Sequence, residues 1–194
     1  MKNSKTKMLV EGAVMVALAT VLSFIKVYKI PWGGSVTLLS MLPIALYSIK
    51  YGVKNGLMAS LLYAIVQLGQ GIFIDGVLGW GLTPVMLIAC ILFDYIIAFV
   101  VLGLAGMFRK AGLKGNIIGV IIALLLRFCS HYISGVVVFA SAGKLWEGFS
   151  TDNTYLYSLL YNGSYMLPEI IFTSIGAVIL LNIPQTKKLF TPNK

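Results

Sequence analysis

Long apolar stretches alternate with short polar or glycine-rich connections along the whole 194-residue chain. A helix needs about 20 mainly apolar residues to cross a bilayer, and six stretches approach or exceed that length. They cover residues 8–27, 36–50, 53–74, 84–108, 115–141 and 155–182, of which the second is short. The pattern predicts an all-α, polytopic membrane protein, a bundle of about six transmembrane helices that forms one transmembrane domain over residues 1–194.

The connections are typical of turns and contain no further domain. They read "KIPWGGS" (29–35), "KYG" (50–52), "DGVLGWGLTP" (75–84), "RKAGLKGN" (109–116) and "SAGKLWEGFSTDN" (141–153). The N-terminal stretch resembles a secretory signal peptide, but Glu11 interrupts its apolar part, and the apolar residues continue to Ile25. We therefore expect an uncleaved first membrane helix.

Composition supports a membrane protein, and the distribution of charge predicts its orientation. The chain is 59% hydrophobic and 11% charged, whereas a soluble domain carries about 25% charged residues. Eleven basic residues fall on one side of the predicted helices and three on the other. The eleven are Lys2, Lys5, Lys7, Lys50, Lys54, Arg109, Lys110, Lys114, Lys187, Lys188 and Lys194, and the three are Lys26, Lys29 and Lys144. The positive-inside rule then predicts a protein of the cell membrane with both termini in the cytoplasm.

The same distribution argues against nucleic-acid binding, and no motif indicates a metal or nucleotide site. The formal charge is +9, but the basic residues mark the ends of apolar stretches and form no single patch. Cys90 and Cys129 both lie in apolar segments and form no paired motif. No phosphate-binding loop and no zinc-binding motif is present. We expect no metal and no cofactor.

Five ionisable residues lie inside the apolar stretches, namely Glu11, Asp94, Arg127, His131 and Glu169. Each costs at least about 2.5 kcal/mol to insert, so they should face the protein interior or an aqueous cavity. Glu11 suits the positive N-terminal end of the first helix. Glu169 follows Pro168, which should kink its helix, and it can either satisfy local donors or line a cavity.

One face of the fifth apolar stretch collects unusual residues. Arg127, His131, Gly135 and Phe139 recur at intervals of four and therefore share one side of a helix. Asp94, in the fourth stretch, can pair with Arg127 or contact a ligand, and both roles are compatible. His131 can be a satisfied core residue or a ligand contact. Gly135 either lets another helix approach or leaves room for a ligand.

Polar and aromatic residues also gather where the last helix begins and in the connections on the same side. The helix starts with "YLYSLLYNGSYMLPE" (155–169), which contains Tyr157 and Asn162. Trp32, Trp80 and Trp146 lie in three connections. These tryptophans fit an interfacial aromatic belt, or alternatively a set of rings that stacks on a ligand.

These features together resemble the substrate-binding S components of energy-coupling factor (ECF) transporters, most closely the thiamine-specific ThiT family. The most specific stretches are "EGAVMVALA" (11–19), "LFDYIIAFVVLGLAGMFR" (92–109), "RFCSHYISGVVVF" (127–139) and "YSLLYNGSYMLPE" (157–169). The resemblance implies a protein without catalytic activity that binds thiamine from outside with high affinity. It also implies association with a transmembrane T subunit and two ATPase subunits, which use the ATP. The family's docking motif for the T subunit matches Ala13 and Ala17.

The resemblance also assigns candidate binding residues. It implies that Asp94 and Tyr95 contact the aminopyrimidine of thiamine. The other family positions match His131, Gly135, Tyr157 and Asn162, and Arg127 falls where family members carry a basic residue. We expect Arg127 to support Asp94.

Two residues depart from the family pattern. Asp94 replaces a glutamate that is common there, and Phe139 stands where a stacking tryptophan is found. Trp32, Trp80 or Trp146 could supply the missing ring surface. The thiazolium ring of thiamine is a permanent cation, and aromatic faces attract cations.

Other functions remain open at this point. The chain could be an S component for another vitamin, or a solitary proton-coupled vitamin transporter in which Asp94, His131 or Glu169 relays protons. A small membrane enzyme that uses Asp94 and His131 as acid and base has less support, because no nucleophile or metal cluster accompanies them.

Overall fold

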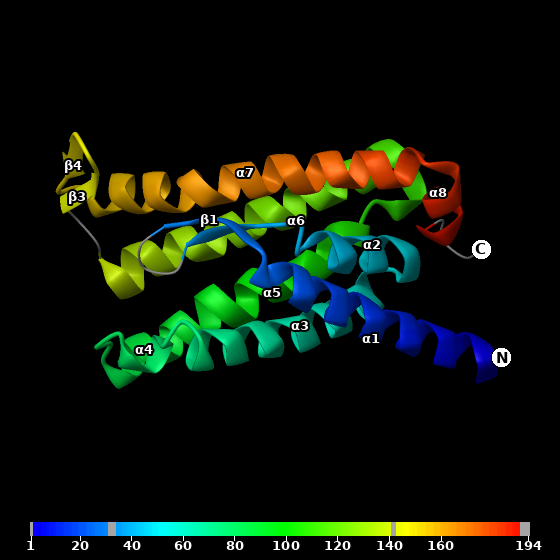
Figure 1. Cartoon of the computed structure of the whole chain (residues 1–194), viewed down its shortest axis with the longest axis horizontal. Coiled ribbons are helices and arrows are strands. Elements are labelled where there is room, and N and C mark those ends of the chain that lie inside the picture. The colour runs from blue at the N-terminus through cyan, green and yellow to red at the C-terminus, as the bar shows by residue number, and fades with distance from the viewer. Residues whose placement is uncertain (1, 31–33, 141–142, 191–194) are drawn as a thin grey trace.

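The computed structural model describes residues 2–30, 34–140 and 143–190 and shows an elongated helical bundle (Figure 1). The helices are α1 Lys2–Phe24, α2 Leu42–Tyr51, α3 Val53–Phe73, α4 Pro84–Cys90, α5 Ala98–Val100, α6 Gly112–Ser134, α7 Thr154–Asn182 and α8 Pro184–Phe190. The strands are β1 Lys26–Lys29, β2 Ser35–Thr37, β3 Gly143–Trp146 and β4 Phe149–Thr151. β1 pairs with β2, and β3 pairs with β4, each as an antiparallel hairpin. The predicted all-α bundle of about six helices is confirmed, with two small hairpins added.

Several helical segments depart from regular α-helical geometry. Two are π-helical, η3 Ile91–Ile97 between α4 and α5 and η6 Gly135–Phe139 at the end of α6. Others are 3₁₀-helical, among them η2 Val77–Gly79, η4 Val101–Gly106 and η5 Arg109–Ala111. The fourth predicted helix therefore runs from α4 to η4 with three changes of pitch.

The helices suit a membrane. Within the described residues, four stretches are long and apolar enough to cross one, namely 4–24, 53–73, 84–139 and 154–182. The third stretch contains two arms, because the chain reverses near η5 and α6 packs back against η3 and η4. Large apolar side chains such as Ile65, Val85 and Ile171 are exposed on the outside of the bundle, as expected where lipid surrounds a multi-pass protein.

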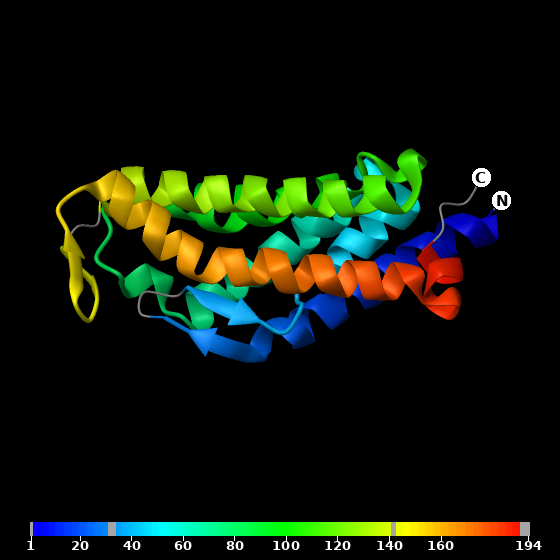
Figure 2. The same cartoon turned by 90° about the horizontal axis from the view of Figure 1, so that it is seen from above.

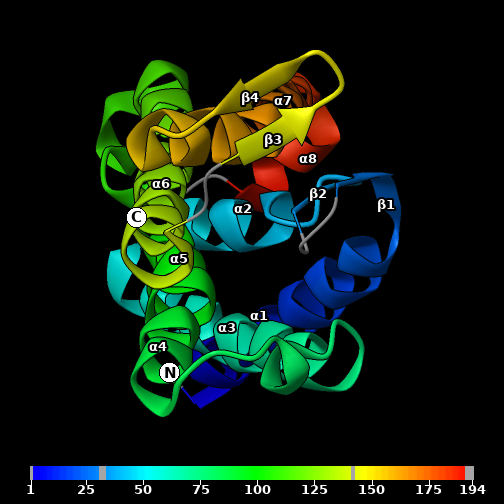
Figure 3. The same cartoon turned by 90° about the vertical axis from the view of Figure 1, so that its left-hand side faces the viewer.

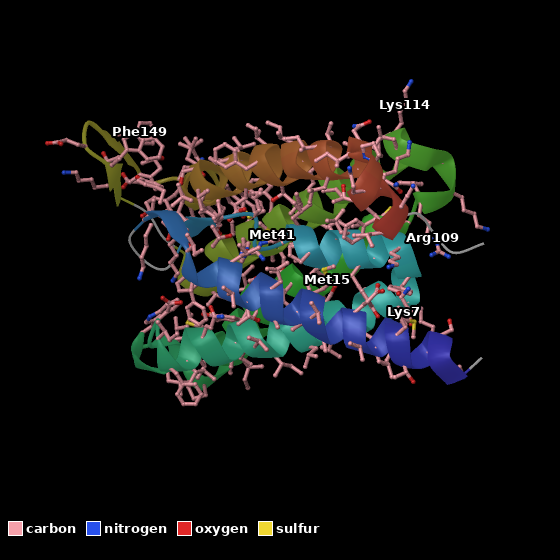
Figure 4. The ribbon with its side chains drawn as sticks, turned by 45° about the vertical axis from the view of Figure 1, so that its right-hand side comes forward. Lys7, Met15, Met41, Arg109, Lys114 and Phe149 are labelled. Carbon is pink, nitrogen blue, oxygen red and sulfur yellow. The ribbon has the colours of Figure 1, made fainter. Side chains whose placement is uncertain are left out.

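The two ends of the bundle differ. The start of α1 and all of α8 lie at one end, which we call the terminal end, and the β3–β4 hairpin lies at the other, which we call the hairpin end (Figure 2). Lys7, Arg109 and Lys114 gather at the terminal end, and Phe149 lies at the hairpin end (Figure 4). The sequence predicts these basic residues on one side of the membrane, and in the structure they lie at one end of the bundle.

The predicted second helix differs most from the structure. Residues 36–37 belong to β2, and α2 has only ten residues, of which 42–50 are all buried. At 1.5 Å per residue it is about 15 Å long, too short to cross a bilayer core of about 30 Å. Figure 3, a view along the bundle from the hairpin end, shows α2 near its centre, with α1, α6 and α7 around it. The apolar residues of α2 therefore contact protein and not lipid.

Close helix packing at the terminal end depends on glycine. A Cβ atom on Gly103 would lie 2.5 Å from the backbone nitrogen of Leu57, so η4 and α3 touch through their backbones. The Ser48 hydroxyl, on α2, donates to the Gly103 carbonyl at 2.5 Å and accepts from the Gly106 N–H at 3.0 Å. Small residues allow such approach in membrane bundles, and the hydroxyl adds interhelical hydrogen bonds.

Glu11 has a different environment from the one expected. Because α1 begins at Lys2, Glu11 lies well inside the helix and not at its N-terminal end. Its Oε2 accepts from Lys50 Nζ at 2.6 Å and from Tyr51 Oη at 2.8 Å. Lys50 is only 8% exposed, so this ion pair joins α1 to α2 inside the protein.

Candidate functional site

A cavity of about 330 Å³ lies in the half of the bundle nearer the hairpin end. That volume is within the usual range for small-molecule sites. Its lining residues come from α1, β1–β2, α3, the 74–83 connection, η3, α5, α6, η6 and α7. They include Ser23, Lys26, Thr37, Gln67, Gln70, Asp75, Trp80, Asp94, Tyr95, Phe99, Arg127, His131, Gly135, Phe139, Tyr157, Ser158, Tyr161, Asn162, Tyr165 and Glu169. All of the predicted binding residues in the described ranges therefore line one cavity.

Asp94 and His131 form the polar centre of this cavity. His131 Nδ1 lies 2.8 Å from Asp94 Oδ1, and Ser134 donates a hydrogen bond to Asp94 Oδ2. An ionised carboxylate only accepts, so Nδ1 of the imidazole carries the proton in this bond. Nε2 of His131 is buried and has no hydrogen-bond partner in the described part of the chain. In the neutral imidazole this nitrogen is an acceptor available to a ligand N–H or O–H.

Asp94 lies in one π-helical segment, and His131 lies in α6 one turn before another. Asp94 and Tyr95 belong to η3, and Gly135 and Phe139 are the first and last residues of η6. A π turn contains more residues than an α turn and frequently marks a functional site. A π turn changes which side chains share a helix face. The spacing of four residues therefore holds for 127–135, which lie in or next to α6, and holds less well for Phe139, which lies at the end of η6.

The expected ion pair between Asp94 and Arg127 is wrong. Among the described residues Asp94 pairs with His131, which lies one helical turn after Arg127 on α6. The Arg127 guanidinium carbon lies 3.9 Å from the centroid of the Phe99 ring, a cation–π contact. Its Nε and one terminal nitrogen are buried, with no hydrogen-bond partner among the described atoms. Arg127 lines the cavity but does not hold Asp94 in place.

Tyrosines form one wall of the cavity along α7. Tyr157 and Tyr161 stack with ring centroids 6.2 Å apart, and Tyr161 meets Tyr165 edge to face at 6.1 Å. Tyr165 also meets the His131 ring at 5.9 Å. The spacing of four residues in "YSLLYNGSY" puts these rings on one helix face, so the sequence contained the signal for Tyr161 and Tyr165.

Gly135 lets α6 approach α7, where the Ser158 hydroxyl donates to the Tyr132 carbonyl of α6 at 2.8 Å, and Asn162 forms hydrogen bonds within the adjoining part of α7. The Asn162 amide donates to the Ser158 carbonyl at 2.9 Å, and its oxygen accepts from Tyr165 Oη at 2.7 Å. A Cβ atom on Gly135 would collide with the Ser158 hydroxyl. Both readings of Gly135 therefore hold, because it admits the neighbouring helix and also lines the cavity.

The β1–β2 hairpin is hydrogen-bonded at three points to the segments around the cavity, namely the 74–83 connection and α7. Lys26 Nζ donates to Asp75 Oδ1 at 3.2 Å, and the Gly34 N–H donates to Tyr161 Oη at 3.3 Å. The backbone N–H and the hydroxyl of Thr37 both donate to Glu169 Oε1, at 2.6 and 2.7 Å. Glu169 thus satisfies local donors and also lines the cavity, and the two alternatives for this residue are combined.

The tryptophans differ in position, because one lines the cavity and another lies at the surface as in an interfacial belt. Trp80 lines the cavity, and its ring centroid lies 6.0 Å from that of Phe139. Trp146 is 46% exposed, stacks on Phe149 at 5.4 Å, and is not among the lining residues. Trp32 lies outside the described residues. Trp80 therefore enlarges the aromatic surface at Phe139, whereas Trp146 is placed as an interfacial residue would be.

Ala13 and Ala17 lie on the exposed side of α1, away from the cavity. The opposite side of the helix is buried. Gly12 faces Tyr47, whose hydroxyl would lie 3.0 Å from an added Cβ atom. The predicted docking motif is therefore accessible from outside the bundle, and it remains a prediction.

Several lining residues were not predicted from the sequence. Ser23 on α1 accepts from the side-chain amides of Gln67 and Gln70 on α3, both at 3.0 Å. Asp75, in a glycine-rich connection, and Thr37, in a short strand, also line the cavity. These residues come from segments that no helical periodicity relates to α6, so their proximity to His131 depends on tertiary packing.

Comparisons with known proteins agree on one family. The family model described as thiamine transporter protein (Thia_YuaJ) matches residues 9–190. The thiamine transporter ThiT of Bacillus subtilis (strain 168) is 37% identical over 188 residues, which cover 89% of this chain and 88% of that protein. A solved structure of ThiT from Listeria monocytogenes superposes with a TM-score of 0.71 at 27% identity, over 98% of this chain and 100% of that one.

Proposed function

The chain belongs to the thiamine transporter protein family, whose members are transporters and not enzymes, and we propose that it is the high-affinity thiamine-binding S component of an ECF-type transporter. It takes up vitamin B1 across the cell membrane together with a T subunit and two ATPase subunits. Both termini face the cytoplasm, and the cavity takes thiamine from the outside. The chain itself uses no cofactor, because the partner subunits hydrolyse the ATP.

The observation that carries this proposal is the arrangement of Asp94 and His131 in an aromatic cavity. The Asp94 carboxylate suits the amino group and ring nitrogens of the aminopyrimidine, and the aromatic rings of the same cavity suit the cationic thiazolium. His131 Nε2 is a buried acceptor without a partner among the described residues, which suits the amino group of the pyrimidine. Leaving such a group unpaired costs about 1–3 kcal/mol, so a ligand that satisfies it gains affinity.

The remaining predicted residues supply the walls around thiamine. Trp80 and Phe139 form an aromatic surface that can stack on one ring of the ligand. Tyr157 provides a second ring surface, and Tyr95 and Asn162 provide polar groups. Ring stacking in such sites contributes about 0.5–1.5 kcal/mol for each aromatic pair.

Thiamine titration of the purified chain tests the proposal. Calorimetry in detergent, without ATP and without partner subunits, should give submicromolar affinity for thiamine. Riboflavin and biotin serve as controls and should not compete at similar concentrations. Tight binding of another vitamin in place of thiamine would keep the S-component function and overturn the substrate.

Reconstitution tests the role of the partner subunits. Vesicles that contain this chain alone should bind thiamine without accumulating it. Co-expression with a T subunit and two ATPases should give ATP-dependent uptake, and leucine at Ala13 and Ala17 should abolish co-purification of the T subunit. Uptake by the chain alone, driven by a pH gradient, would instead identify a solitary proton-coupled transporter.

A further inference from the structure

Two serines of α6 contact the π-helical segment that carries Asp94. Ser130 donates to the Phe93 carbonyl at 2.6 Å, and Ser134 donates to Asp94 Oδ2. Both serines are buried, with exposed fractions of 3% and 0%. Because they lie four residues apart, they share one face of α6, and His131 lies beside them. This part of α6 therefore forms hydrogen bonds with two consecutive residues of η3.

The two hydroxyls differ in their use from most hydroxyls inside a helix. A serine there commonly donates to the carbonyl four residues before it, as Ser60 does to Gly56 at 2.8 Å. Ser130 and Ser134 instead donate to another segment. Their hydrogen bonds therefore join η3 to α6 at the point where Asp94 lines the cavity.

Ser130 acts on the main chain immediately before Asp94. A π turn interrupts the regular α-helical pattern of hydrogen bonds, and here the Ala98 N–H donates to the Tyr95 carbonyl, three residues before it. In membrane proteins, hydroxyl groups of neighbouring helices supply donors to carbonyls where a helix is irregular. The hydroxyl of Ser130 at the Phe93 carbonyl therefore stabilises the orientation of the peptide group that precedes Asp94.

Ser134 and His131 hold the two oxygens of the Asp94 carboxylate. His131 Nδ1 lies 2.8 Å from Oδ1, and Ser134 donates to Oδ2. A carboxylate held at one oxygen can still rotate, whereas donors at both oxygens fix its plane. Each oxygen can accept twice, so the carboxylate keeps the capacity to accept from a ligand. In its fixed position Asp94 also determines which nitrogen of His131 carries the proton.

We propose that Ser130 and Ser134 are positioning residues, which hold Asp94 so that His131 keeps its proton on Nδ1 and presents Nε2 to the ligand as an acceptor. This inference rests on the proposed function, in which Nε2 accepts from the amino group of the pyrimidine. With the proton on Nε2, two donors would face each other, and the ligand would lose this hydrogen bond. The serines therefore affect affinity through Asp94 and His131, without contacting the ligand.

The position of the proton can be measured directly, because His131 is the one histidine of the chain. After incorporation of isotope-labelled histidine, the untagged protein in detergent gives imidazole nitrogen NMR signals from this residue alone, and they distinguish the two neutral tautomers. Spectra recorded above neutral pH without ligand should show the proton on Nδ1 in the wild-type chain. S134A should give a mixture of tautomers, and S130A a smaller change in the same direction.

Thiamine calorimetry on the same samples measures the consequence for binding. Affinity should fall about fivefold in S134A, as expected for one hydrogen bond lost beside the site. It should fall about twofold in S130A, where the lost bond lies one residue farther away. D94A removes the acceptor of Nδ1 and should abolish the preference between tautomers, so it sets the scale of the spectral change.

S60A is the matched control. It also removes a hydroxyl that is 0% exposed, but this hydroxyl bonds within its own helix and is not among the groups that line the cavity. The imidazole spectrum and the thiamine affinity of S60A should equal those of the wild-type chain. Weaker binding in both α6 variants with an unchanged spectrum would show that the serines only join two helices, and it would overturn the inference.

The test remains decisive where S134A folds poorly. A wild-type spectrum with the proton on Nε2 overturns the inference without any variant, and an unchanged spectrum in folded S130A overturns the role of Ser130. The spectra need no ligand, so the result is separable from that of the proposed function. A wild-type chain with its proton on Nδ1 that does not bind thiamine contradicts the proposed function and supports the positioning of Asp94 and His131.

Discussion

The two halves of the bundle contain the same kinds of residue in opposite situations. At the terminal end, Glu11 is neutralised by Lys50 and also bonded to Tyr51. At the hairpin end, Asp94 has hydrogen bonds with His131 and Ser134. The first carboxylate joins two helices through an ion pair with a lysine, whereas the second has no lysine or arginine in an ion pair with it among the described residues. A charged residue within a membrane segment therefore indicates a binding site only when its own protein leaves it without a counter-charge.

The glycines make the same contrast. Gly103 brings backbones of η4 and α3 together, and an added Cβ atom there would meet a backbone nitrogen, which cannot move aside. An added Cβ atom on Gly135 would meet side-chain atoms of Ser158. The terminal half is thus closed by backbone contact, and the hairpin half by side chains that can rearrange. Changes in the first half should affect stability, and changes in the second should affect binding.

The largest effect is expected from G103V. The branched side chain would separate η4 from α3, and overpacking of this kind costs about 3 kcal/mol. For a chain of this length that corresponds to a fall in Tm of roughly 6–12 °C. A fluorescence melt in detergent measures it. Thiamine affinity of the folded fraction should stay within about twofold of wild type, since the cavity is remote from this contact.

D94A should have the next largest effect, on binding. It removes the carboxylate at the polar centre of the cavity and leaves Nδ1 of His131 without its acceptor. Loss of a charge-assisted hydrogen-bonding group costs about 1.5–3 kcal/mol, or roughly 10–150-fold in Kd. Calorimetry with thiamine measures the loss. A fall in Tm as large as that of G103V, with affinity retained, would contradict the division between the two halves.

E11Q should affect stability moderately and leave binding unchanged. The glutamine keeps the hydrogen bond to Tyr51 but leaves Lys50 without a counter-charge. Since the Glu11 side chain is 27% exposed, water compensates part of the loss, and about 1–2 kcal/mol is expected, below the 3–5 kcal/mol of a fully buried pair. The melt of E11Q should therefore lie between those of wild type and G103V. Weakened thiamine binding would show that the two halves are coupled.

F139A should give the smallest measurable effect. Phe139 and Trp80 form one aromatic surface, so its removal should weaken thiamine binding by about 1 kcal/mol, or roughly fivefold. W146A is the matched control, because Trp146 has a ring of similar kind outside the cavity. Its affinity should equal that of wild type. Equal losses in both variants would mean that the β3–β4 hairpin takes part in binding.

Much of the fold could be predicted because membrane helices have a strong signal. The limits of α3 and α7 agree with the sequence to within one residue at each end, since both are long apolar stretches, one preceded by Gly52 and the other by Asn153. The second predicted helix was extended too far, because hydropathy does not distinguish burial in protein from burial in lipid. The β1–β2 hairpin was missed, because its strands have three and four residues and so show little alternation.

The site was partly predictable for the same reason. A spacing of four residues grouped Arg127 with His131, and the fold places both on the cavity. The partner of Asp94 was mistaken, because the spacing puts Arg127 and His131 on the same face and does not show which of them Asp94 meets. No pattern within one segment indicates that Asp75 or Glu169 would meet the hairpin. Those contacts depend on how distant segments pack.

The short helix α2 has a consequence for how the protein is made. The ten residues of α2, which end in Tyr51 and include Lys50, cannot remain in lipid alone, because they do not span it. Only Gly52, at φ 84°, separates α2 from α3, so the two must enter the membrane as one unit. Besides the 84–106 arm, α2 contacts α7 and α8, so its last face is covered only when these C-terminal helices have entered. The centre of the bundle can therefore close only after nearly the whole chain has been synthesised.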